Sequence, residues 1–140
     1  MSWGRFHHAI GLDWLAALNE KFPLWKEKIN VVFLPLYNEE FDVIKGTLDA
    51  LSASSYPAKS LYVVISGEAR LLGHWQKIQS VIRENYSSVF ADLIFYTHPD
   101  GLSGEIPGKG SNIHHAEWEF KKYADQKGWR YEDIIISVFD

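Results

Sequence analysis

Residues 104–112, GEIPGKGSN, form the segment of this chain best suited to bind an anion. Small residues flank Lys109, so the backbone can approach a ligand closely while the ammonium group supplies positive charge. Phosphate is the obvious ligand for such a segment. It ends a polar stretch, residues 97–110, that is too long for a simple turn, and an ordinary flexible loop with one exposed lysine stays open as the alternative.

The spacing in this segment excludes a P-loop. That motif requires Gly, four residues, and then Gly-Lys followed by Ser or Thr. Here Ser103 stands where the first Gly is required, and Gly110 stands where the magnesium-binding hydroxyl should be. An anion site at Lys109 must therefore be of a different kind.

Two pairs of adjacent residues, Glu39-Glu40 and His114-His115, carry metal-ligating side chains. Neighbouring side chains on a helix diverge, so neither pair holds a metal ion by itself. The acids are explained by the positive end of a helix that begins there. We interpret the histidines as surface or packing residues, and single out only His98, which follows a predicted strand.

The last residue, Asp140, ends an apolar run, residues 134–139, that predicts a buried strand. A single carboxylate is a poor cation site, because magnesium or manganese requires several oxygen ligands. A strand-end acid that caps a turn is the alternative interpretation.

The composition predicts one packed domain that does not bind nucleic acid. The 140 residues are 46% hydrophobic and 15% aromatic, and the formal net charge is −4. No stretch concentrates positive charge along a nucleic-acid backbone. The chain has no Cys, so disulfides and thiolate metal sites are excluded. No apolar run is long enough for a signal peptide or a membrane span, and we expect a cytoplasmic protein.

Strands and helices alternate from residue 30 onward, which predicts an α/β, Rossmann-like, mostly parallel sheet of about four strands with helices on both faces. The expected strands are residues 31–36, 61–65, 91–96 and 134–139. Pro35 must lie at the end of its strand, because it cannot donate to a ladder. We expect Asn38 to cap the helix that follows the first strand, Ser111 to cap a later helix, and Gly128 to end it.

The N-terminal residues 1–29 predict a helical extension. Ile10, Trp14, Leu18 and Phe22 are spaced four apart, which predicts an amphipathic helix over residues 10–22. Such a stripe most often docks on its own domain. A position at the cytoplasmic face of a membrane is the alternative, because lysines accompany the aromatic residues.

The loops that follow parallel strands lie along one edge of the sheet, where open α/β folds bind ligands. Tyr37 and Glu39 follow the first predicted strand and Glu68 follows the second. His98 begins the loop after the third strand, and Asp140 ends the fourth. We therefore expect these side chains to share one site.

Three segments in this order resemble the family 2 glycosyltransferases of GT-A fold: residues 35–40 (PLYNEE), residues 108–112 (GKGSN) and the apolar strand that ends at Asp140. The family has P-x-Y-N-E after its first strand, K-x-x-N before a helix, and Asp-x-Asp after its fourth strand. The resemblance covers residues 30–140. It implies the nucleotide-sugar-binding half of a GT-A domain, with the chain ending within the metal motif.

The resemblance implies a role for each matching residue. Pro35, Tyr37 and Glu39 would contact the nucleotide, with Tyr37 packed on the base and Glu39 bonded to the ribose. Lys109 and Asn112 would lie near the base and the diphosphate. Asp140 would help to hold a divalent ion, Mg²⁺ or Mn²⁺. The second Asp, the acceptor site, the general base and, in many members, membrane helices would lie beyond residue 140, so this chain alone is expected to be inactive.

The sequence departs from the family at the end of the second strand. The family commonly has Asp-Asp or Asp-x-Ser there, whereas this chain has residues 66–68, SGE, and Glu68 is the candidate for the acid that reads the base. Two other interpretations stay open: a non-catalytic nucleotide- or anion-binding module, and a protein-interaction domain. A half-domain would expose a sheet edge to be covered by its missing C-terminal half, and we expect self-association through that edge.

Overall fold

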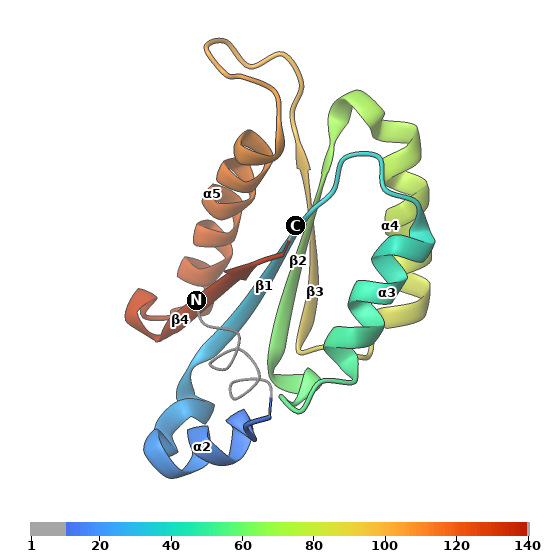
Figure 1. Ribbon diagram of the computed structural model, residues 1–140. Helices are drawn as coiled ribbons and strands as arrows, with labels where there is room; N and C mark the ends of the chain where they lie inside the picture. The colour runs from blue at the N-terminus through green and yellow to red at the C-terminus, as the bar shows by residue number, and fades with distance from the viewer. Residues whose placement is uncertain (1–10, 140) are drawn as a thin grey trace, which may run out of the picture.

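The structure is a computed structural model that describes residues 11–139, and Asp140 lies outside them. It contains a four-stranded, all-parallel sheet with strand order β3-β2-β1-β4 (Figure 1). The strands are β1 (Ile29–Pro35), β2 (Leu61–Glu68), β3 (Asp92–His98) and β4 (Ile134–Val138). The α-helices are α2 (Trp14–Lys21), α3 (Phe41–Ser52), α4 (Leu72–Tyr86) and α5 (Lys109–Lys127). Short 3-10 helices are η1 (Pro23–Glu27), η2 (Ala58–Ser60), η3 (Ala69–Leu71) and η4 (Tyr131–Asp133).

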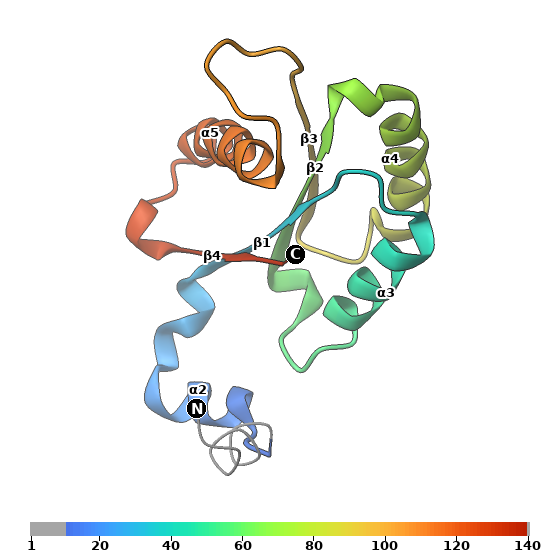
Figure 2. The same cartoon turned by 45° about the horizontal axis from the view of Figure 1, so that its top comes forward.

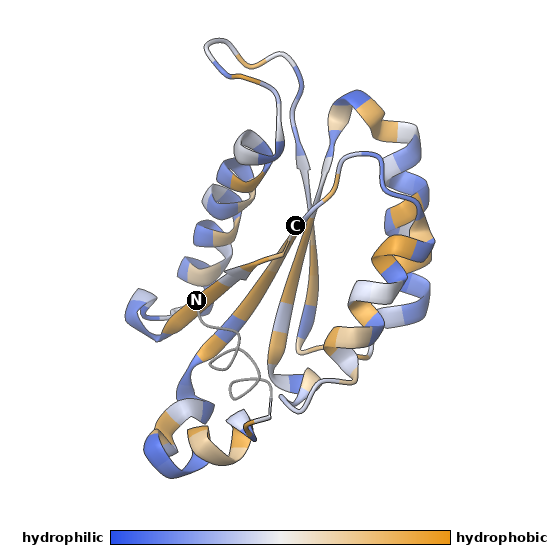
Figure 3. Ribbon diagram, viewed as in Figure 1, coloured by the Kyte–Doolittle hydropathy of each residue, from blue (hydrophilic) through white to orange (hydrophobic). Residues whose placement is uncertain are grey.

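Helices cover both faces of the sheet, with α3 and α4 on one side and α5 on the other (Figure 2). The alternation of side chains along β1 explains this arrangement. Val32 and Leu34 pack in the cluster with α3 and α4, whereas Val31 and Phe33 pack with α5. Hydrophobic residues accordingly concentrate in the strands (Figure 3). The predicted α/β architecture and the position of Pro35 at the end of β1 are confirmed.

Strands β2 and β3 run past the ends predicted for them. Their apolar runs stop at Ile65 and Tyr96, but the parallel ladder continues until Glu68 pairs with His98. A backbone ladder needs no apolar side chain, so the apolar run underestimates the strand. Glu68 and His98 therefore lie in strands, and their predicted placement in the loops that follow is wrong.

The helices after β1 and β3 also begin elsewhere than predicted. Helix α3 starts at Phe41 with Glu40 as its N-cap, so Asn38 does not cap it. Helix α5 starts at Lys109, and Ser111 lies in its first turn, where its hydroxyl accepts a hydrogen bond from the Gly108 N–H at 3.0 Å. Gly128 ends α5 with φ 69°, as predicted.

Strand β4 is exposed, although its apolar run predicted a buried strand. It pairs with β1 at one edge of the sheet, and Ile135, Ile136 and Val138 are all exposed. A continuous apolar run is therefore compatible with an edge strand. Exposed edges of this kind are open to pairing with another chain, so self-association stays a prediction.

The N-terminal helix is shorter than predicted, and none of the described residues of its apolar stripe is buried. Helix α2 begins after Asp13, whose carboxylate accepts a hydrogen bond from the Ala16 N–H at 2.9 Å, and none of its residues is buried. Trp25 of η1 anchors the segment instead, with its ring 5.3 Å from that of Tyr56. Ile10 lies outside the described residues. No helix among residues 11–139 is long and apolar enough to cross a membrane.

We expect the protein to lose stability in alkaline solution because of Tyr86. It is buried at the end of α4 and donates its hydroxyl to Asp49 Oδ1 at 2.6 Å. Burial, and then the Asp49 carboxylate, raise the pKa of Tyr86 to about 12. Because the pKa is higher in the folded state, the stability that the Tyr86 hydroxyl contributes is fully present below pH of about 10 and is lost between about 10 and 12. Across this window, the Tm measured by thermal melts should fall less steeply with pH for Tyr86→Phe than for wild type. Equal slopes would contradict the assignment, and Asp49→Asn should be intermediate.

Candidate functional site

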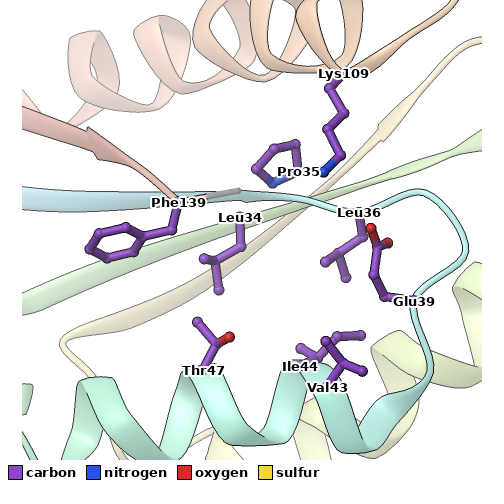
Figure 4. Close-up of a pocket in the computed structure, with 9 residues that line it drawn as sticks. All are labelled: Leu34, Pro35, Leu36, Glu39, Val43, Ile44, Thr47, Lys109 and Phe139. Atoms are coloured by element: carbon purple, nitrogen blue, oxygen red, sulfur yellow. The ribbon is translucent and has the colours of Figure 1, made fainter.

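All six predicted nucleotide-binding residues line two adjacent hollows at the carboxyl edge of the sheet. The first, here called the polar hollow, has a volume of about 240 Å³ and is lined by Leu36, Tyr37, Glu68, Arg70, Gly108, Lys109 and Asn112. The second, called the apolar hollow, has about 110 Å³ and is lined by Leu34, Pro35, Leu36, Glu39, Val43, Ile44, Thr47, Lys109 and Phe139 (Figure 4). Leu36 and Lys109 line both hollows.

The order of the strands explains why the hollows form here. Helix α3 leaves β1 to cover one face of the sheet, while α5 approaches β4 along the other face. The chain therefore diverges where β1 and β4 lie side by side, and such switch points are the ligand sites of open α/β sheets. In Figure 4 the Lys109 side chain extends from the start of α5 toward the end of β1, and Phe139 lies at the end of β4.

Glu39 closes a turn instead of lying in the first turn of a helix. Its carboxylate accepts a hydrogen bond from the Tyr37 N–H at 2.6 Å, and the His74 ring lies 3.1 Å from the Glu39 carbonyl oxygen. Both Glu39 and Glu40 precede the first residue of α3. Neither acid lies in the first turn of α3, and their explanation by the positive end of the helix stays a prediction. The turn leaves Tyr37 about half exposed beside the polar hollow.

Asn112 joins three elements and keeps an unused acceptor. Its Nδ2 group donates hydrogen bonds to the carbonyl oxygens of Leu36 and Ser66, both at 3.2 Å. These two acceptors determine which end of the amide faces the strands, because a flipped amide would oppose oxygen to oxygen. The side chain is 1% exposed, and its Oδ1 atom has no hydrogen-bond partner within the described chain. A buried acceptor without a donor costs about 1–3 kcal/mol, and a ligand N–H or O–H could remove that cost.

Sequence reasoning missed Arg70, which lines the polar hollow. Its Nε atom lies 3.4 Å from Glu68 Oε2, and its guanidinium carbon lies 4.7 Å from the centre of the Tyr37 ring. Arg70 thus links the tyrosine expected to pack on a base with the acid expected to read it. Its position two residues after Glu68, at the end of the strand, was the available signal.

His98 lies between two carboxylates. Its Nδ1 atom is 3.1 Å from Glu68 Oε2, and its Nε2 atom is 3.2 Å from both carboxylate oxygens of Glu105. Glu105 belongs to the loop that joins β3 to α5. On α5, the His115 ring packs 5.5 Å from the His98 ring, and burial lowers the pKa of His115. His114 accepts a hydrogen bond from Trp118, so the interpretation of both helix histidines as surface or packing residues is confirmed.

The described residues do not form a metal site. Among residues 11–139, no three His, Asp or Glu side chains are placed to hold a metal ion together. Asp140, the residue predicted to bind a divalent cation, lies outside this range. Its role stays a prediction.

The chain matches no protein family model, no curated protein and no solved structure. The geometry of the site and the resemblance of its motifs are therefore the basis for a functional proposal.

Proposed function

We propose that this chain is the nucleotide-binding part of an inverting glycosyltransferase that uses a nucleotide-diphosphate sugar. The proposal combines the motif resemblance with a site at the switch point of a parallel sheet. The general base and acceptor site of that enzyme are expected outside the residues described.

The unsatisfied Asn112 Oδ1 atom carries the proposal. It is a buried acceptor of a residue that lines the polar hollow together with Lys109 and Arg70. A ligand for this hollow should therefore offer an N–H or O–H donor together with negative charge. A nucleotide has both, since its base and ribose carry donors and its diphosphate carries the charge.

Each residue then has a position relative to the ligand. Tyr37 packs on the base, and Arg70 on the ring of Tyr37 supports it from the protein side. Lys109 lies where the two hollows meet and faces the diphosphate. In the reaction, an acceptor hydroxyl attacks the anomeric carbon while the bond to the diphosphate breaks on the opposite face. The ammonium group of Lys109 offsets the charge that develops on the leaving diphosphate.

Titration with UDP and GDP by calorimetry, with and without Mn²⁺, tests the proposal. We expect Lys109→Ala to weaken binding at least about tenfold, or about 1.4 kcal/mol. Lys77→Ala is the matched control, because it removes an exposed lysine on α4 that lines neither hollow. Its affinity should equal that of wild type.

The metal dependence separates the two classes of function. Binding that requires Mn²⁺ and is lost in Asp140→Ala supports a transferase. Binding without Mn²⁺ that is lost only in Lys109→Ala supports the non-catalytic nucleotide or anion module. No heat of binding with either nucleotide at millimolar concentration would contradict both.

A further inference from the structure

The side chains around His98 require more protons than a neutral imidazole carries. Ionised carboxylates only accept hydrogen bonds, and a neutral imidazole has one N–H. Here both ring nitrogens lie within 3.2 Å of carboxylate oxygens, from Glu68 on one side and Glu105 on the other. With a neutral ring, one nitrogen lone pair would face a carboxylate oxygen. While Glu68 and Glu105 are both ionised, only a ring with two N–H groups satisfies both contacts.

The charges of the cluster lead to the same conclusion. Glu68 and Glu105 contribute two negative charges, and Arg70, 3.4 Å from Glu68, contributes one positive charge. A second positive charge on His98 makes the cluster neutral. The side chains of His98 and Glu68 are both 4% exposed, and buried charges are tolerated only when they are paired. From α5, the His115 ring faces His98, and Glu119 and Lys122 act on His115 with opposite signs.

Glu105 connects this cluster to the loop that joins β3 to α5. It lies in the exposed loop of residues 99–108, in which Gly101 and Gly104 have positive φ values of 72° and 80°. Its contact with His98 joins the loop to the end of β3. Glu68, the other partner of His98, lines the polar hollow. The histidine thus stands between the loop and the candidate site.

We propose that His98 is a positioning residue that, as an imidazolium, bonds Glu68 and Glu105 together and so holds the loop of residues 99–108 against the sheet. Loss of its proton removes one of the two bonds and replaces it by repulsion between a lone pair and a carboxylate. The loop is therefore held against the sheet while the ring carries both protons, and it is released when the ring loses one. This inference concerns the free protein and does not depend on nucleotide binding.

Two measurements on the full chain without nucleotide test it. The ¹⁵N chemical shifts of the His98 ring, assigned by comparison with His98→Gln, should show both nitrogens protonated at pH 6. Hydrogen exchange of residues 99–108, corrected for intrinsic rates, should accelerate at least about tenfold in Glu105→Ala and, in wild type, when His98 loses its proton. The same change in Glu117→Ala, an exposed glutamate on α5, should have no effect on the loop.

Glu105→Gln separates charge from contact. Its amide keeps an acceptor near His98 but removes the negative charge, so hydrogen exchange of the loop should lie between that of wild type and that of Glu105→Ala. A His98 ring with one proton at pH 6, or equal loop exchange in wild type and Glu105→Ala, would overturn the proposal. Either outcome leaves the nucleotide titrations unaffected, so the two proposals fail separately.

Discussion

Gly67→Ala is expected to lower the free energy of unfolding by about 2–3 kcal/mol, and Tm by about 10 °C. An added Cβ at Gly67 would lie 2.2 Å from Trp75 Cδ2 and 2.6 Å from Cε3. The indole is buried and fixed by a hydrogen bond from its Nε1 to Thr97 Oγ1 at 2.8 Å, so it cannot rotate away cheaply. The φ angle of Gly67 is not positive, so the cost is one of space and not of backbone strain.

Two further variants make this result specific. Gly46→Ala places the same methyl group inside α3, where nothing lies within 4 Å of the new atom, and should raise stability by about 0.5–1 kcal/mol. Trp75→Leu opens space beside Gly67, so the Gly67→Ala/Trp75→Leu double variant should be more stable than the sum of the single changes predicts. Strict additivity, measured by urea unfolding, would show that contact with Trp75 is not the cause.

Local patterns were sufficient to predict the elements of the fold. Apolar runs located β1, β2 and β3, because burial of a strand leaves a pattern in the sequence. The same patterns did not predict the strand ends where polar residues continue the ladder. Glu68 and His98 extend two strands because they pair with each other across the ladder, and no local rule encodes a partner thirty residues away.

The sequence pointed to six residues that line the two hollows, but it missed Arg70 and the contacts among these side chains. Strand ends and the Lys109 segment indicated the edge of the sheet, since topology alone brings them together. The unsatisfied oxygen of Asn112 and the stacking of Arg70 on Tyr37 depend on side-chain geometry across three elements. The exposure of β4 depends on what packs against it, and its apolar sequence says only that burial would be favourable.

Asn112→Asp should cost about 3 kcal/mol at pH 7, although it changes a single atom in the side chain. The change replaces the donor that bonds Leu36 and Ser66 by a carboxylate oxygen, which faces two carbonyl oxygens at about the same distance. The group is almost fully buried, so water cannot offset this repulsion. The ends of β1 and β2 and the first turn of α5 should separate, and the nucleotide binding proposed for the polar hollow should be lost with them.

The pH dependence of this variant distinguishes electrostatic repulsion from a simple loss of packing. Burial among oxygen atoms raises the pKa of the introduced carboxyl above its unfolded value of about 4, so the neutral form is favoured in the folded protein. Its protonated form can donate to one of the two carbonyls. The stability difference from wild type should therefore shrink as pH falls from 7 toward 4, and grow as pH rises through the folded-state pKa.

Asn85→Asp is the matched control, since it makes the same chemical change on the exposed side of α4 and removes one hydrogen bond to the Val81 carbonyl. Thermal melts should show a shift of a few degrees at most for the control, and a penalty for Asn112→Asp that does not vary with pH would contradict this account of the site.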